Sequence, residues 1–413
     1  MILKLSINDK TKNSSVIISG SKSESNRLLL LQAFFPNIII ENLSDADDTI
    51  LMKKALNSTE SIIDVHHSGT AMRFLTAYFS IQESREVILT GSSRMKERPI
   101  EILVEALRGL GADIQYLENE GFPPLKIKGK NLIKHKISIP AHVSSQYISA
   151  LLLIAPKLEN GLEMTMEGNI TSKPYIEMTL ALLHQIGVET SGVKNVIKIN
   201  PKLQTPNSKF IVESDWSSAS YFYSIVALSE IGTAITLSSF TENSLQADKA
   251  LVEIYRNFGV NTVFNKDSSI TISKTENLEL SLLSFELQES PDIAQTIAVT
   301  CFGLGVGCKL TGLHTLKIKE TDRLQALKNE IEKLGGKVEI TENSLSLEQH
   351  SFTWQNREGE YSVNTYQDHR MAMAFAPLAL KMNLIIKEAE VVSKSYPNFW
   401  KDLKNIGFQV SEI

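Results

Sequence analysis

Residues that can bind anions or move protons recur in short groups along this 413-residue sequence. Each group joins Lys or Arg to Ser, Thr, Asp or Glu. The groups lie at residues 22–27, 69–73, 94–98, 172–175 and 319–323, and a lone lysine follows at 394. Guanidinium and ammonium groups bind phosphates and carboxylates, and paired carboxyl groups can give and take protons. The pattern indicates a site for ligands that carry several negative charges.

Most of these groups lie where a helix is expected to begin, and the group at 94–98 precedes a helix expected to begin at Pro99. A helix N-terminus offers free N–H groups and the positive end of the helix dipole, so it attracts anions. Ordinary helix caps and solvated surface cations would explain any one group. Cations at helix N-termini oppose the dipole, however, and their repeated placement there favours a ligand site over solvation alone.

Composition excludes several other classes of protein. The net charge is −5, from 42 basic and 47 acidic residues, which disfavours a nucleic-acid binder. The sequence shows no signal-peptide pattern and no apolar run long enough to span a membrane. The two cysteines, Cys301 and Cys308, are expected inside one helix and fit a reducing compartment. We therefore expect a cytoplasmic protein that binds neither nucleic acid nor membrane.

Metal and nucleotide motifs are also missing from the sequence. His66 and His67 have no third ligand nearby, and adjacent residues on a strand point apart, so no metal-ligand set is evident. Neither a Walker motif nor a nucleophile elbow occurs. We expect no metal and no cofactor.

A recurring pattern describes the elements that position these groups. An amphipathic helix is followed by an apolar residue, a glycine and an apolar strand, with the glycines at 111, 187, 259, 335 and 407. Their spacings of 76, 72, 76 and 72 residues exceed the about 20–50 residues of common solenoid repeats. Each glycine occupies the place where a helix ends in a left-handed residue. The pattern predicts a repeated module.

A second type of helix recurs six times, opened by small polar residues. Its copies are expected near residues 25, 69, 144, 217, 291 and 368. We expect a shortened first module, because Leu56-Asn57-Ser58 replaces its glycine. Short β-rich runs separate the helices, for example Leu125–Lys128 and Ile270–Ser273. Each module is therefore a mixed α/β unit with two helices. A chain of this length suits two domains, or three small ones.

The polar groups closely resemble motifs of the 5-enolpyruvylshikimate-3-phosphate synthase family, the 3-phosphoshikimate 1-carboxyvinyltransferases. The matching motifs, in family order, are Gly20-Ser-Lys-Ser-Glu-Ser-Asn-Arg27, Gly69-Thr-Ala-Met-Arg73, Arg94-Met-Lys-Glu-Arg-Pro-Ile100, Ser144-Ser-Gln146, Ser172-Lys-Pro-Tyr175, Ser217-Ser-Ala-Ser-Tyr221, Lys319-Glu-Thr-Asp-Arg323, Asp368-His-Arg370 and Lys394-Ser-Tyr-Pro397. Together they cover nearly the whole chain.

The resemblance implies an α/β (α+β) fold with two similar domains. Each domain would contain three βαβαββ repeats, with helix N-termini facing an interdomain cleft. One enolpyruvyl transferase domain would span residues 20–212, and the second would combine residues 1–19 and 213–413. The implied reaction transfers the enolpyruvyl group of phosphoenolpyruvate to shikimate 3-phosphate and releases phosphate, in the biosynthesis of chorismate and aromatic amino acids. A monomer is expected, and the family is the target of glyphosate.

The resemblance also assigns roles to individual residues. Residues implied to contact shikimate 3-phosphate are Lys22, Ser23, Arg27, Ser144, Ser145, Gln146, Ser172, Tyr175 and Lys319. Residues implied to hold phosphoenolpyruvate are Lys22, Gly69, Arg94, Arg323, Arg370 and Lys394, with His369 close by. Asp292 would act as the base at the attacking hydroxyl and Glu320 as the proton carrier to the methylene carbon, with Lys22 assisting. Addition followed by elimination needs these transfers.

The sequence departs from the family pattern at a few positions. His67-Ser68 precede Gly69 where the family often has Asn-Ala, and Thr315 replaces a common Asn. One alternative is the related transferase that acts on UDP-N-acetylglucosamine, which usually carries a reactive Cys in the loop matching Ser92–Glu97, where this chain has none. Another is a non-catalytic relative that binds anions. The presence of Lys22, Asp292 and Glu320 argues against the latter.

Overall fold

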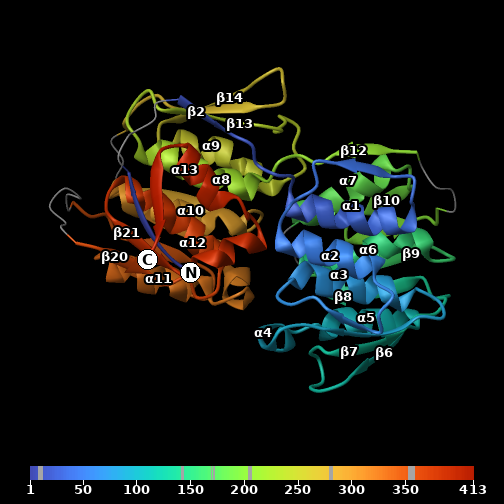
Figure 1. Ribbon diagram of the computed structural model, residues 1–413. Helices are drawn as coiled ribbons and strands as arrows, with labels where there is room; N and C mark the ends of the chain where they lie inside the picture. The colour runs from blue at the N-terminus through green and yellow to red at the C-terminus, as the bar shows by residue number, and fades with distance from the viewer. Residues whose placement is uncertain are drawn as a thin grey trace. The chain divides into compact units, whose positions relative to one another are not determined.

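A computed structural model describes residues 1–7, 13–140, 144–168, 170, 173–202, 207–278, 282–351 and 359–413. The chain divides into two compact units, each with many internal contacts. We call Gly20–Val212 the inserted unit, because Met1–Ser19 and Glu213–Ile413 together form the other, which we call the terminal unit. Figure 1 shows the two units in the colours of the chain.

One arrangement of strands and helices recurs through both units. Within the described residues, five four-stranded sheets share the same order, in which the first two strands pair in parallel and the rest pair antiparallel. In the first of these modules the elements are β4 (Ile62–Asp64), α3 (Gly69–Ser80), β5 (Glu86–Thr90), α5 (Glu101–Leu110), β6 (Asp113–Tyr116) and β7 (Leu125–Lys128), with a short α4 (Ser93–Lys96) before α5. The predicted mixed α/β fold is confirmed.

The second complete module of the inserted unit follows directly along the chain. Its elements are β8 (Lys136–Pro140), α6 (Ser145–Ile154), β9 (Leu162–Glu167), α7 (Lys173–Gln185), β10 (Thr190–Val193) and β11 (Val196–Ile199). A shorter module combines α1 (Lys22–Phe34), β3 (Ile39–Glu41) and α2 (Asp47–Asn57) with β12 (Lys209–Ile211) from the other end of the unit. Its sheet has two strands, and α2 ends at Ser58 instead of glycine, as the shortened motif predicts.

The terminal unit repeats the same strand order in three sheets. The first module contains β2 (Asn13–Val16), α8 (Trp216–Leu228), β13 (Ala234–Leu237), η2 (Ala247–Ala250), α9 (Leu251–Arg256), β14 (Val260–Phe264) and β15 (Ile270–Lys274). The second contains β16 (Leu282–Glu286), η3 (Pro291–Ile293), α10 (Ala294–Leu304), β17 (Gly307–Thr311), η4 (His314–Ile318), α11 (Arg323–Lys333), β18 (Val338–Ile340) and β19 (Leu345–Leu347). The third contains β20 (Tyr361–Val363), α12 (His369–Phe375), η6 (Ala376–Leu380), β21 (Leu384–Lys387), η7 (Ala389–Lys394), α13 (Phe399–Asn405), β22 (Phe408–Glu412) and β1 (Ile2–Ile7).

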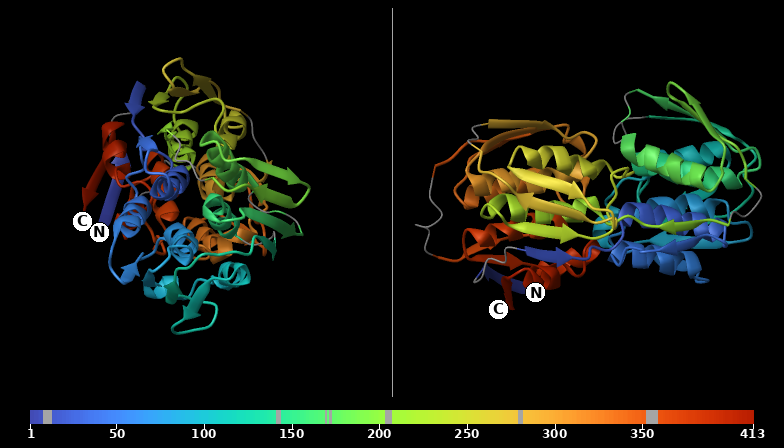
Figure 2. Two further views of the ribbon diagram at one scale, coloured as in Figure 1. Left: turned by 90° about the vertical axis from the view of Figure 1, so that its right-hand side faces the viewer. Right: turned by 90° about the horizontal axis from the view of Figure 1, so that it is seen from above.

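Two types of helix play different parts in each unit. The first helix of a module is buried almost all round: every residue of α8 except Ser217 is buried, as is every residue of α3 except Thr70. The second helix, such as α5, buries one face and exposes the other. Figure 2 shows the helices of each unit packed together with strands along their outer sides. The first helices α1, α3 and α6 contact one another, and so do α8, α10 and α12.

The predicted glycines end the second helices. Gly111, Gly187, Gly259, Gly335 and Gly407 all have positive φ, between 70° and 111°. A residue with a Cβ adopts this conformation only with strain, so glycine is favoured at each helix end. The regular spacing of these residues in the sequence therefore marks the same point in each module, the end of its second helix.

Two local expectations are wrong. Cys308 lies on β17, while Cys301 lies on α10, because Gly305 with φ 75° ends α10 between them. The helix expected from Pro99 begins at Glu101, and Ile100 precedes it as the cap. In the described part of the chain, no helix is both long enough and apolar enough to cross a membrane.

Candidate active site

The guanidinium of Arg323 is the centre of the charged cluster in the terminal unit. Its side chain is 2% exposed. Its Nε donates to Asp368 at 2.7 Å, its Nη1 donates to Asp292 at 3.0 Å and its Nη2 donates to Glu320 at 2.8 Å. One planar group therefore binds three carboxylates, and it holds the two predicted proton-transfer residues at neighbouring nitrogens.

Both oxygens of Asp292 face cations. Oδ1 lies 3.0 Å from Arg323 and 3.6 Å from the Lys319 ammonium. Oδ2 accepts from Nη2 of Arg370 at 3.0 Å. Asp292 lies on η3 at the entrance to α10, while its three partners come from the segment before α11, from α11 itself and from α12. Residues far apart in sequence thus meet around one carboxylate.

Glu320 is held in a similar way by two cations. Oε2 accepts from Arg323, and Oε1 lies 2.9 Å from the Lys394 ammonium. Lys394 is the last residue of η7, so the third module of the unit supplies it. Both side chains are largely buried, with exposed fractions of 13% for Lys394 and 14% for Glu320. Ion pairs in such positions are much less screened than surface pairs.

Burial and charge shift the pKa values of these cations. Burial lowers the pKa of Lys319, although Asp292 and Glu320 oppose the change. Burial also disfavours the charged form of Arg370, but the carboxylate of Asp292 and those around it raise its pKa well above the usual value. Lys319 can therefore release a proton more readily than a free lysine, whereas Arg370 and Arg323 stay charged.

Asp368 and His369 open α12. The Asp368 side chain caps the helix by accepting from the backbone N–H of Arg370 at 2.8 Å, and it also binds Arg323. His369 is 1% exposed, and its Nδ1 lies 3.7 Å from Asp368. Asp368 therefore orders the two predicted phosphoenolpyruvate ligands that flank it in space, Arg323 and Arg370.

Arg27 is the centre of the corresponding cluster in the inserted unit. It is 3% exposed, and burial lowers its pKa to about 10. Its Nε donates to Thr179 at 2.8 Å and its Nη2 donates to Ser149 at 3.0 Å and to the carbonyl of Tyr175 at 3.3 Å. Nη1 donates to the carbonyl of Ser23 at 2.7 Å. These four bonds leave one of the five guanidinium N–H groups for another partner.

The remaining residues of α1 that were assigned to the site lie in its first turn. Lys22 is the first helical residue, and its ammonium lies 3.3 Å from Asp48 at the start of α2. Ser21 caps the helix, and Ser23 is partly buried. Asp48, which is not among the predicted site residues, therefore balances the charge of Lys22.

Gly69 begins α3 beside two guanidinium groups. A Cβ at this position would lie 2.8 Å from Nη1 of Arg98 and 2.9 Å from Nη1 of Arg73. Arg73 donates to the carbonyls of Gly69 at 3.1 Å and Pro99 at 3.2 Å. The absence of a side chain at Gly69 thus allows two cations to approach a helix N-terminus, where an anion is favoured.

The start of α6 lies against the start of α3. Gln146 donates from Nε2 to Thr70 at 3.2 Å. Ser144 caps α6 by accepting from the backbone of Gln146, and Ser145 is buried next to it. Tyr175, in the first turn of α7, lies with its ring 5.9 Å from the Arg27 guanidinium carbon. Ser172, the remaining predicted residue of this group, lies outside the described residues.

Arg94 is the predicted residue that the structure places apart from the buried clusters. Its side chain is 43% exposed and pairs with Glu97 at 3.0 Å on α4. The loop before Gly69 reaches this helix through Nδ1 of His67, which lies 2.8 Å from the hydroxyl of Ser92, the cap of α4. Arg94 is therefore linked to the Gly69 loop through its helix and not by its own side chain.

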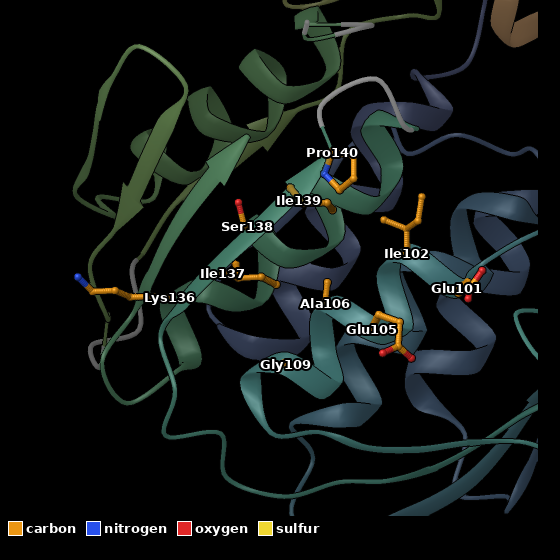
Figure 3. A pocket seen from close by; sticks show the side chains of 10 residues that line it. All are labelled: Glu101, Ile102, Glu105, Ala106, Gly109, Lys136, Ile137, Ser138, Ile139 and Pro140. Carbon is orange, nitrogen blue, oxygen red and sulfur yellow. The ribbon is translucent and has the colours of Figure 1, made fainter. Parts of the chain in front are cut away.

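A groove of about 530 Å³ lies elsewhere on the inserted unit, between α5 and β8. Figure 3 shows Ile102 and Ala106 of α5 beside Ile137 and Ile139 of β8. None of the predicted site residues lines it. It lacks the gathered cations that a polyanionic substrate requires, so the charged clusters are the stronger candidate site.

Metal binding has no evident place among these side chains. Within the described ranges, no group of three or more His, Cys, Asp or Glu residues is arranged to hold a metal ion. The carboxylates of the terminal unit are instead paired with arginine and lysine.

Comparisons with known proteins extend over most of the chain. The family model of EPSP synthase (3-phosphoshikimate 1-carboxyvinyltransferase) matches residues 40–403. A 3-phosphoshikimate 1-carboxyvinyltransferase from Bacteroides fragilis is 44% identical to this chain, with 96% of each chain covered. Another from Haemophilus influenzae is 35% identical, covering 95% of this chain and 96% of the relative.

Solved structures resemble the chain in fold. An EPSP synthase from Acinetobacter baumannii has a TM-score of 0.78 at 21% identity, with both chains fully covered. The enolpyruvyl transferase NikO from Streptomyces tendae has a TM-score of 0.72 at 12% identity, covering 99% of this chain and 98% of its own. At these identities the likeness establishes the fold.

Proposed function

Because this chain belongs to the EPSP synthase family, we propose that its two charged clusters serve the transfer of an enolpyruvyl group between two anionic substrates. The chain is a transferase of the shikimate pathway. It joins phosphoenolpyruvate to shikimate 3-phosphate and forms 5-enolpyruvylshikimate 3-phosphate and phosphate.

The residues assigned to each substrate come from both units. In the inserted unit, Arg27, Ser23, Gln146 and Tyr175 bind shikimate 3-phosphate, and Lys22 contacts both substrates. Of the other residues assigned to this substrate, Ser144, Ser145 and Ser172 lie in the inserted unit and Lys319 lies in the terminal unit. Gly69, Arg94, Arg323, Arg370, His369 and Lys394 bind phosphoenolpyruvate. Several cations are needed because two polyanions must be held near each other without mutual repulsion.

The observation that carries the mechanism is the shared guanidinium of Arg323. It holds Asp292 at Nη1 and Glu320 at Nη2, so one planar group positions both carboxyl groups. In the addition step the substrate hydroxyl oxygen bonds to the enol carbon and gives its proton to Asp292. Glu320, which enters this step in its protonated form, meanwhile gives a proton to the methylene carbon, which becomes a methyl group.

Elimination reverses the proton transfer at carbon. Glu320 takes a proton from the methyl group, the electrons of that C–H bond form the new carbon–carbon double bond, and the carbon–oxygen bond to phosphate breaks. The proton that Asp292 took from the hydroxyl passes to the departing phosphate, so both carboxyl groups return to their starting states. The cations around the carboxylates stabilise the negative charge that the phosphate carries as it leaves. The carboxyl groups and the lysines of the chain thus provide the proton donors and acceptors that the two steps require.

A phosphate-release assay with purified protein tests this function. We expect release that depends on both shikimate 3-phosphate and phosphoenolpyruvate, with no release when UDP-N-acetylglucosamine replaces the first. The opposite acceptor preference would assign the related transferase activity instead. Binding of both substrates without release would support a non-catalytic anion-binding protein.

We also propose that the protein acts as a monomer in the cytoplasm, with each unit an enolpyruvyl transferase domain of three repeats. The repeated strand order within each unit supports the last point. Sedimentation of the purified protein across a range of concentrations tests the monomer, because a self-associating enzyme would sediment faster as its concentration rises.

A further inference from the structure

Asp248 is a buried carboxyl group without an assigned role in the terminal unit. It lies on η2 and is 3% exposed. Its Oδ2 accepts a hydrogen bond from the hydroxyl of Ser217, whereas its Oδ1 is buried without a partner among the described residues. A buried polar oxygen without a partner costs stability, so its retention needs a reason.

Ser217 connects Asp248 to the cluster around Asp292. Its Oγ accepts from Nη2 of Arg370 at 3.3 Å, and the same nitrogen donates to Oδ2 of Asp292 at 3.0 Å. A hydroxyl has one proton. Because Ser217 donates that proton to Asp248 in a hydrogen bond, only its oxygen lone pairs are available to Arg370.

This chain of contacts crosses all three modules of the terminal unit. Asp248 and Ser217 belong to the module of α8, Asp292 to that of α10 and Arg370 to that of α12. The backbone segments that carry Ser217 and Asp248 are joined to each other. Gln246 accepts from the Trp216 N–H at 3.0 Å and donates to the Ser214 carbonyl at 2.9 Å. Asp248 and Ser217 are thus held in a defined relative position.

We propose that Asp248 is a positioning residue which, through Ser217, orients the Arg370 guanidinium against Asp292. The inference rests on the proposed function, in which Arg370 holds phosphoenolpyruvate and Asp292 takes the hydroxyl proton. Correct placement of such groups contributes strongly to rate, and a small displacement far from the reacting atoms is costly.

The charge state of Asp248 fits this task. The pKa of Asp248 is raised to about 7, mainly by burial and then by the charge of Asp292, while Arg370 and the Ser217 hydrogen bond oppose the rise. The charged groups that face it are Asp292 from η3, Arg370 from α12 and Asp215, the cap of α8. When Asp248 is neutral, the Arg370 guanidinium forms its ion pair with Asp292 without competition. When Asp248 is ionised, its negative charge competes with Asp292 for Arg370.

Kinetics of four variants test the proposal. Asp248→Ala and Ser217→Ala should each raise the KM for phosphoenolpyruvate about tenfold, with a smaller change in the KM for shikimate 3-phosphate. The double variant should lose no more than the worse single one, because both act through one chain of contacts. Asp248→Asn can still accept from Ser217 and should recover most of the loss. The wild type should show a change in kcat/KM near neutral pH, where Asp248 titrates, and Asp248→Asn should not show it.

Asp267→Asn is the matched control, since Asp267 lies in the turn between β14 and β15 and contacts Ser269. It should behave as the wild type. Unchanged kinetics of both Asp248→Ala and Ser217→Ala would overturn the proposal, even with a lower Tm, and so would losses that add in the double variant. If Asp248→Ala does not fold, Ser217→Ala and Asp248→Asn decide alone.

A measurement without turnover separates this inference from the proposed function. In protein with labelled arginine, the guanidinium signal that Arg370→Lys removes should shift in both Asp248→Ala and Ser217→Ala. An unmoved signal would show that Asp248 and Ser217 do not orient Arg370, whatever reaction the protein catalyses. Lack of phosphate release by the wild type, together with a shifted signal, would reject the proposed function alone.

Discussion

Arg323 and Asp368 form a buried ion pair, with Nε of the arginine 2.7 Å from the aspartate oxygen and side-chain exposures of 2% and 0%. The pair joins α11 to the cap of α12, so it links two modules. Its guanidinium also holds Asp292 and Glu320. The geometry of the proposed proton-transfer groups thus depends on Asp368, which lies outside the predicted set.

Asp368→Ala should destabilise the terminal unit by about 3–5 kcal/mol, because it leaves a buried guanidinium without one partner. Loss of the α12 cap adds about 1 kcal/mol. Urea denaturation followed by tryptophan fluorescence measures the change. Glu348→Ala removes an exposed partner of Lys337 and should cost less than about 1 kcal/mol. Equal effects of the two substitutions would show that the buried pair contributes little.

Glu320→Gln should reduce kcat by about 10²–10⁴-fold while substrate binding changes far less, because the amide keeps the shape of the side chain but cannot transfer the proton. Single-turnover phosphate release and calorimetric binding separate the two quantities. Glu342→Gln is the control, since Glu342 is 90% exposed and pairs with Lys317. A parallel loss of binding and turnover in Glu320→Gln would refute its role in proton transfer.

Gly69→Ala should raise the KM for phosphoenolpyruvate by about tenfold with a smaller effect on kcat. The new Cβ would meet the guanidinium nitrogens of Arg98 and Arg73 at 2.8–2.9 Å and displace them from the start of α3. The unfolding temperature should hardly change, because flexible side-chain ends can move aside. Gly109→Ala, where nothing lies within 4 Å, should leave the KM as it is. An unaltered KM in Gly69→Ala would place the anion elsewhere.

Asp248→Asn should stabilise the protein more at pH 8 than at pH 5. The pKa of Asp248 is raised in the folded protein to about 7, so between its ordinary value and pH 7 the folded state binds more protons than the unfolded state. The wild type therefore loses stability as pH rises through this range, and the asparagine variant does not. A gain of 1 kcal/mol would raise Tm by about 2–4 °C.

Asp267→Asn provides the comparison for that measurement. The Ser269 hydrogen bonds lower the pKa of Asp267, so this group stays ionised at both pH values. Its Tm difference from the wild type should be the same at pH 5 and pH 8. A Tm difference for Asp248→Asn that is equally independent of pH would show that Asp248 titrates as an ordinary exposed carboxyl group.

Much of the architecture followed from local features of the sequence. The five glycines that end the second helices could be located because a left-handed helix end favours glycine wherever it occurs. The six first helices begin within a few residues of the expected positions, since small polar caps and apolar runs are local signals. The helix expected across Cys301 and Cys308 failed because Gly305 ends α10 within an apolar run, and apolarity alone does not separate helix from strand.

The candidate site was predictable in part. Cations are unusual at helix starts, and this placement indicated Lys22, Arg27 and Arg323. The resemblance to a known family added the roles of Asp292 and Glu320. Asp48, Asp368 and Asp248 went unassigned. Each is an acidic residue at the start of a helical segment, where an ordinary cap is the simpler explanation. No feature of the sequence distinguishes a cap from the partner of a buried cation.

The sequence by itself determined the module length, the helix ends and the types of residue that can bind phosphates and move protons, because these depend on neighbours along the chain. Tertiary structure decided which charges neutralise one another. Asp292 meets Arg323 and Arg370 across 31 and 78 residues of sequence, and Arg323 meets Asp368 across 45. Burial then set the strength of these pairs, since an interaction between charges depends on their distance and on the exclusion of water, and neither can be read from spacing along the chain.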